Sequence, residues 1–284
     1  MRPEPAAPYS PLQPLERGKF LAATINGIAI YVLAYYLVWG LHDASKVAMS
    51  HVFQLRGHWN PSSVVYTLDD GEWWRSAIIG VYGSGPLACL ILGLLAFRRY
   101  WYHARAYRGQ FKLLLVWVAF HSCNAVFGAL LGDTFTESGF WYVPEWLLRV
   151  GNVANVLFAL LAGLAQLALG YFGAIAFLQA HDSHTVMRYD NRKIMVFSTI
   201  ILPWLVGSVV ITLLKAPYIT VQEFVHLAMM GLLVTPLALG CRSEIFSQPV
   251  RRPMATHIAW GFVVLALVVA VTWRLALSPP VSFG

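Results

Sequence analysis

Seven long apolar runs dominate this sequence and limit the folds that it can adopt. They cover residues 20–41, 77–97, 113–132, 150–179, 195–214, 221–240 and 256–277. An α-helix needs about 20 apolar residues to cross the hydrocarbon core of a bilayer. Charged residues make up only 12% of the chain, against about 25% in soluble domains. The sequence therefore predicts an all-α polytopic membrane protein with about seven transmembrane helices, whose first partner is the lipid bilayer.

Lysine and arginine are distributed unequally between the connections. Fourteen of the 20 fall on the side of the N-terminal segment and six on the other. Cytoplasmic loops carry the excess of positive charge, so we expect a cytoplasmic tail (1–19), an external C-terminus and a bacterial inner membrane. Because these cations lie in short connections and form no continuous stripe, no nucleic acid is expected as a partner. The larger set is Arg2, Arg17, Lys19, Arg98, Arg99, Arg105, Arg108, Lys112, Arg188, Arg192, Lys193, Arg242, Arg251 and Arg252.

The connection after the first run has the pattern of a short β-hairpin or a re-entrant segment. Within residues 52–76, the alternating stretch 64–67 is β-prone, and the sequence 69–71 is typical of a tight turn. Trp59, Trp73 and Trp74 flank this stretch, and tryptophan is enriched at the membrane–water boundary. We therefore expect the hairpin to lie at the membrane surface.

Ionisable residues follow the first apolar run directly. His42, Asp43 and Lys46 have the spacing H-D-x-x-K. Such groups at the end of a membrane segment are costly and commonly functional. Metal chemistry, an internal ion pair and simple contact with water all remain open for these three side chains.

The third run carries a stripe of polar and small residues. His121, Asn124 and Gly128 follow one another at helical spacing, and Gly132 and Asp133 close the run. Such a stripe lets helices approach closely and hydrogen-bond across the contact. We expect Asp133 to pair with Lys46, because the predicted topology puts both at the external end.

Two further patterns lie in the second and sixth runs. Gly85 and Pro86 mark a kink and a close helix contact. Glu223 and His226 form an E-x-x-H pair, which holds metal only with partners from other helices. In the next connection after the fourth run, His181, Asp182 and His184 are expected to be solvated.

Taken in order, the first three runs resemble the site-2-protease-type intramembrane metalloproteases, over residues 20–135. That family has H-E-x-x-H in its first core helix, a G-P-x-x-N stretch in the second and an aspartate in the third. Here His42-Asp43-x-x-Lys46, Gly85-Pro86 and Asp133 stand in the corresponding places. The resemblance implies a three-span core (20–135), followed by a four-span region (136–284) that it does not cover.

The departures from the family pattern decide the predicted function. The resemblance puts His42 at a zinc ligand, Asp43 at the general base and Asp133 near the third ligand. Lys46 replaces the second histidine and Cys89 the substrate-binding asparagine, which implies vestigial catalytic positions and no metal cofactor. We therefore expect a non-catalytic scaffold or regulator that binds a membrane protein or helix.

Two alternatives belong to other classes. The chain could be an active zinc-dependent intramembrane peptidase with His42, His121 and Asp133 as an unusual ligand set. It could instead be a transporter or channel subunit in which His121, Asn124, Glu223 and His226 line a polar path. Bound zinc distinguishes the first, and substrate flux the second.

Overall fold

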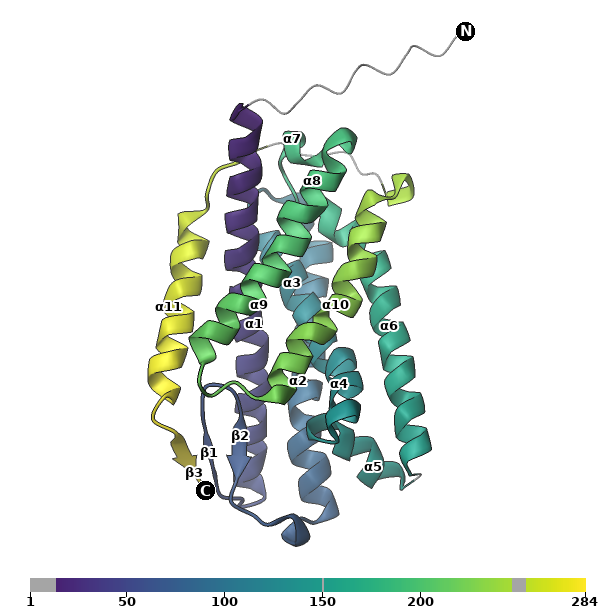
Figure 1. Ribbon diagram of the computed structural model, residues 1–284, viewed down its shortest axis with the longest axis vertical. Helices are drawn as coiled ribbons and strands as arrows, with labels where there is room; N and C mark the ends of the chain where they lie inside the picture. The colour runs from purple at the N-terminus through teal and green to yellow at the C-terminus, as the bar shows by residue number, and fades with distance from the viewer. Residues whose placement is uncertain (1–13, 150, 247–253) are drawn as a thin grey trace.

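Seven helical segments of the described residues are long and apolar enough to cross a membrane, and they form one bundle (Figure 1). The structure is a computed structural model that describes residues 14–149, 151–246 and 254–284. The seven predicted spans are thereby confirmed, and the chain is a multi-pass integral membrane protein. Arg2, Arg251 and Arg252 of the charge count lie outside the described residues, as do residues 1–13 of the predicted tail. The first helix already begins at Pro14.

Five of the seven spans each contain one long α-helix, and the third and fifth spans are built from several helical pieces. The helices are α1 (Pro14–Val52), α2 (Arg75–Tyr102), α3 (Phe111–Cys123), α4 (Ala129–Thr136), α5 (Tyr142–Leu148), α6 (Asn152–Gln179), α7 (His184–Met187), α8 (Arg192–Val196), α9 (Leu202–Lys215), α10 (Val221–Arg242) and α11 (Trp260–Leu277). Single 3-10 turns lie at Asp70–Glu72, Ala104–Ala106, Gly139–Trp141, Tyr189–Asn191 and Glu244–Phe246.

Two π-helical turns interrupt spans and were not predicted. One, η3 (Asn124–Gly128), joins α3 to α4; the other, η6 (Phe197–Ile201), joins α8 to α9. A π turn widens the helix locally and is frequent at functional sites. In η3 it places Asn124 and Gly128, both members of the predicted stripe, at a helix contact.

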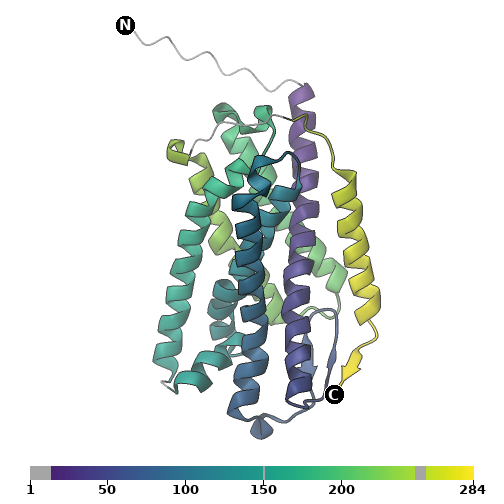
Figure 2. The same ribbon diagram turned by 180° about the vertical axis from the view of Figure 1, so that it is seen from behind.

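Helix α1 is the central element of the bundle. It packs against α2 and α3 from the first half of the chain and against α9 and α11 from the second. Helices α6 and α11 lie at opposite edges of the bundle in both views (Figures 1 and 2). Exposed leucines and valines cover their outer faces, for example Leu161, Leu164, Val264 and Leu267. Such surfaces suit contact with lipid tails.

A small antiparallel sheet lies at one end of the bundle. Strands β1 (Gly57–Trp59) and β2 (Val64–Tyr66) form the expected hairpin, and β3 (Val281–Phe283) adds to the free edge of β1. The predicted position of the turn is wrong: the hairpin turns at Asn60, whose Oδ1 accepts the backbone N–H groups of Ser62 and Ser63 at 2.9 and 2.8 Å. Figure 1 shows this sheet at the end opposite α7.

Candidate functional site

Buried polar side chains from four helices meet in the half of the bundle nearer the sheet. None of them exposes more than 6% of its surface. Ionisable groups inside a membrane bundle are costly and mark functional sites by default. We call this set the polar core; it comprises Tyr35, His42 and Asp43 on α1, Asp133 on α4, Lys215 on α9, and Glu223 and His226 on α10.

The first part of the polar core is an ion pair between the ends of two spans. Lys215 is the last residue of α9, and Glu223 lies in the first turn of α10. Thr220 caps α10, since its Oγ1 accepts the Glu223 N–H at 3.2 Å. This short connection brings the two charges together, and both Lys215 Nζ and the Tyr35 hydroxyl donate to Glu223 Oε1.

Aromatic rings complete the surroundings of the lysine. Lys215 Nζ also donates to the Tyr35 hydroxyl at 3.0 Å and lies 4.9 Å from the centroid of that ring. Sequence reasoning missed Lys215 and Tyr35. The available signal was a lysine that ends one span, followed after a short connection by a glutamate that begins the next.

Asp133 is held by three donors from its own chain. Gln222 Nε2 donates to Oδ1 at 2.7 Å, His226 Nε2 lies 2.6 Å from the same oxygen, and the Phe140 N–H donates to Oδ2 at 2.7 Å. Gly139 permits this arrangement: its φ is +56°, and a Cβ there would lie 2.5 Å from Asp133 Oδ2. The carboxylate is therefore fully engaged.

The predicted ion pair between Lys46 and Asp133 is not formed within the described residues. Lys46 is half-buried, and its Nζ lies 5.8 Å from the centroid of the Tyr82 ring. The physical reason is the position of α10, which packs against α4. His226 therefore reaches Asp133 from a span that the resemblance does not cover.

His42 and Asp43 form the third part of the polar core. His42 Nδ1 lies 2.9 Å from Asp43 Oδ1, and both residues are buried, so contact with water does not account for them. The His42 ring packs on Gly85, where a Cβ would lie 2.6 Å from His42 Nε2. Trp39 links this pair to Asp133, because its ring lies 4.9 Å from both His42 and His226.

The third span supplies a second polar contact with α10. Asn124 Nδ2 donates to the His226 carbonyl at 2.9 Å, and Asn124 Oδ1 accepts from Gln166 Nε2 at 2.9 Å. Gly128 leaves room for these amides, since a Cβ there would lie 2.7 Å from Gln166 Oε1. Gly132 packs on α10 in the same way, with Val225 Cγ1 2.9 Å from its Cβ position.

His121 stands apart from these hydrogen bonds. Its ring lies 4.5 Å from Tyr31 and 5.9 Å from Tyr35 between ring centroids. Its Nε2 is buried and has no hydrogen-bond partner among the described residues. The structure thus puts His121 among aromatic rings beside the polar core.

The three predicted zinc ligands do not converge on one point in this arrangement. Within the described residues, no three His, Cys, Asp or Glu side chains converge closely enough to hold a metal. Structural and catalytic zinc sites need three or four such ligands. Of the predicted set, Asp133 is bound by three donors, His42 is paired through Nδ1, and His121 faces aromatic rings.

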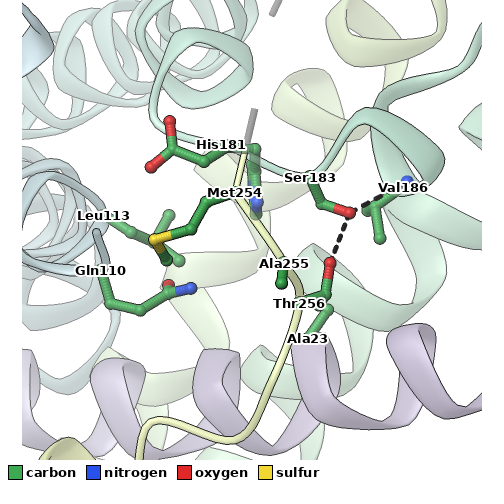
Figure 3. A pocket seen from close by; sticks show the side chains of 10 residues that line it. Ala23, Gln110, Leu113, His181, Ser183, Val186, Met254, Ala255 and Thr256 are labelled. Carbon is green, nitrogen blue, oxygen red and sulfur yellow. Dashed lines mark hydrogen bonds between the residues drawn. The ribbon is translucent and has the colours of Figure 1, made fainter. Parts of the chain in front are cut away.

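A second polar cluster lies at the opposite end of the bundle, and Figure 3 shows side chains around it, among them His181 and Ser183. It surrounds a pocket of about 30 Å³, large enough for a water molecule. Lys112 pairs there with Asp182, which also accepts the Gly109 N–H at 2.8 Å. Burial, together with the charges of Lys112 and Arg192, lowers the pKa of His181 to about 3.

The prediction that the loop at this end is solvated is therefore wrong for His181 and Asp182. His181 and Asp182 are half-buried, and only His184 is exposed. The reason is that Asp182 faces the buried Lys112 at the start of α3.

No family model, curated protein or solved structure matches this chain. The resemblance to the site-2-protease-type enzymes therefore rests on the motif residues alone and stays a prediction.

Proposed function

We propose that the protein is a non-catalytic scaffold or regulator of the membrane, on a core similar to that of the site-2-protease-type enzymes, and that it binds a membrane partner. One observation carries the proposal. Asp133, at the position of a metal ligand in the resemblance, is already bound by Gln222, His226 and the Phe140 N–H. In this arrangement its oxygens stabilise a contact between α4 and α10 and are not free to bind a metal.

The packing of the motif residues is consistent with such a core. His42 lies against Gly85, so the first and second motif segments are in contact. Trp39 and His226 connect them to Asp133 on the third. Lys46 does not take the place of the metal. Instead, Asp133 contacts His226 and Gln222 of α10, and these hydrogen bonds replace the metal bridge.

Metal content tests the non-catalytic part of the proposal. The protein is purified without chelators, and its zinc is measured beside His42→Ala and a control, His184→Ala, which changes an exposed histidine at the other end. We expect less than stoichiometric zinc in all three proteins and no cleavage of a membrane-helix substrate. One zinc per chain that disappears only in His42→Ala would overturn the proposal in favour of a peptidase.

Crosslinking tests the partner. We expect crosslinking in intact membranes, followed by mass spectrometry, to join the chain reproducibly to one defined membrane protein. Crosslinks only to abundant neighbours, in proportion to their abundance, would refute a scaffold role.

A transporter or channel subunit is the second candidate, and it has its own observation. Glu223 Oε2 and His121 Nε2 are buried without a hydrogen-bond partner among the described residues, as polar groups along an ion path would be. Flux of protons or small ions into liposomes, lost in Glu223→Gln but kept in the exposed control Glu137→Gln, would favour this function over a scaffold.

We also propose a cytoplasmic N-terminus and an external C-terminus in a bacterial inner membrane. The charge asymmetry supports this orientation. Reporter fusions at Gly109 and Gly71, in connections at opposite ends of α2, test it: the reporter that is active in the cytoplasm should report only from Gly109.

A further inference from the structure

A groove between α2, α3 and α6 opens toward the surrounding lipid. Leu94 and Phe97 of α2 and Leu169 and Phe172 of α6 form its walls, and all four are exposed. Its lining is almost wholly apolar, and it encloses about 340 Å³. Figure 2 shows α2 and α6 on the near face of the bundle.

The groove has the depth of one leaflet. Its lining follows α2 from Leu90 to Trp101, which is about 16 Å at a rise of 1.5 Å per residue. The hydrocarbon core of a bilayer is about 30 Å thick, so the groove reaches from the middle of the membrane to one surface. An extended acyl chain of a phospholipid has this orientation and reach.

Cations and aromatic rings stand at the surface end of the groove. Arg98 and Tyr102 line a hollow that continues the groove and shares Phe97 and Trp101 with it. The Arg105 guanidinium carbon lies 4.4 Å from the centroid of the Trp101 ring. Neither arginine pairs with a carboxylate of the described residues, so both charges are free to meet an external anion.

We propose that this groove binds one anionic phospholipid. An acyl chain lies between α2, α3 and α6, and the headgroup phosphate contacts Arg98 and Arg105. Basic sites at the membrane ends of helices bind anionic headgroups, and tryptophan and tyrosine lie at headgroup level. An apolar partner helix fits less well, because it would leave Arg98 and Arg105 without the anionic partner that a phospholipid headgroup supplies. The proposal is independent of the proposed function, because no residue of the polar core takes part.

Native mass spectrometry of the detergent-purified protein tests the headgroup contact. Phosphatidylglycerol and phosphatidylcholine with the same acyl chains are titrated separately. We expect tighter binding of phosphatidylglycerol, and Arg98→Gln and Arg105→Gln should each weaken it by about fivefold. The same variants should weaken the binding of phosphatidylcholine less, because its choline group neutralises the phosphate charge. The matched control is Arg99→Gln, because Arg99 is exposed on the same turn but does not line the groove.

Cys123 tests the acyl-chain contact on the folded wild-type protein. It lines the groove and is half-buried, whereas Cys89 and Cys241 are buried. We expect a bulky maleimide at Cys123 to abolish the retention of phosphatidylglycerol, and saturating phosphatidylglycerol to slow the alkylation. Glycerol phosphate, which has the headgroup without acyl chains, should do neither.

Several outcomes would overturn the proposal. Equal binding of the two lipids, or equal weakening of phosphatidylglycerol binding by Arg99→Gln, would mean that no specific headgroup site exists and that diffuse surface charge attracts the lipid. Full lipid retention after alkylation would place the lipid elsewhere, and protection by glycerol phosphate would indicate a site for free phosphate. A dimer that is lost on alkylation would identify a second copy of the chain as the occupant.

Discussion

The buried pair between Lys215 and Glu223 should dominate the stability of the polar core. The two side chains expose 2% and 7% of their surface, so neither charge is well hydrated. In Glu223→Gln, Lys215 keeps the Tyr35 hydroxyl at 3.0 Å and the face of the Tyr35 ring, but it loses its counter-charge. Removing one partner of a buried ion pair costs about 3–5 kcal/mol. Because glutamine retains an oxygen for the same donors, we expect a loss near 3 kcal/mol.

The assay is equilibrium unfolding in mixed micelles, followed with a thiol-reactive dye that reports exposure of the buried Cys89 and Cys241. The double variant Lys215→Met/Glu223→Gln removes both charges, and we expect it to regain most of the loss, with a coupling of at least roughly 2 kcal/mol. The matched control is the Arg188–Asp190 pair, whose side chains are 54% and 75% exposed. Asp190→Asn should have no measurable effect.

Two results would refute this account of the pair. A cost below about 1 kcal/mol for Glu223→Gln would mean that water reaches Lys215 and hydrates it. Simple additivity in the double variant would mean that the two charges do not stabilise each other.

Two further predictions concern the packing of His42 and the protonation of His181. Gly85→Ala should destabilise the protein by about 1–3 kcal/mol, because the new methyl group would lie 2.6 Å from His42 Nε2; Gly83→Ala, whose nearest neighbour is 3.8 Å away, should be nearly silent in the same unfolding assay. Burial lowers the pKa of His181 from its ordinary value of 6.5 to about 3 in the folded protein. The unfolded chain therefore binds a proton at this residue before the folded protein does. The free energy of unfolding is unaffected above pH 6.5 and should fall by about 1.4 kcal/mol per pH unit as the pH drops toward 3. Between pH 7 and pH 4, the free energy of unfolding should fall less steeply in His181→Gln than in wild type, and as steeply as wild type in His184→Gln. Identical slopes in all three proteins would contradict the lowered pKa of His181.

The spans were predictable because hydropathy reports directly on contact with the bilayer. The ends of the helices were not. The first apolar run stops at residue 41, yet α1 continues to Val52, since the sequence from His42 to Val52 contains neither glycine nor proline to end a helix. Hydropathy shows where the membrane ends, and helix signals show where the helix ends; here the two differ by several turns.

Which residues form the candidate site was predictable from the sequence, but which of them contact one another was not. His42, Asp133, Glu223 and His226 all belong to the buried set, because ionisable groups in apolar runs are few and conspicuous. Their pairing depends on which helices are neighbours and how each is rotated, and one sequence contains neither quantity. The expected partner of Asp133 was Lys46, because the predicted topology puts both residues at the external end. The observed contact, His226, comes from α10, which packs beside α4.

The three-stranded sheet can be completed only after the last span has been synthesised, because β3 follows that span. Strand β1 follows the first span, but β3, its second partner, follows the last, and the two pair across almost the whole chain. During synthesis β1 leaves the ribosome early and keeps one unpaired edge while six further spans enter the membrane. Contacts between such distant segments form slowly, because the intervening chain must first be ordered. Completion of the three-stranded sheet therefore reports that the last helix has inserted in its place, and an antibody specific for the paired β1–β3 edge would distinguish finished molecules from those arrested during insertion.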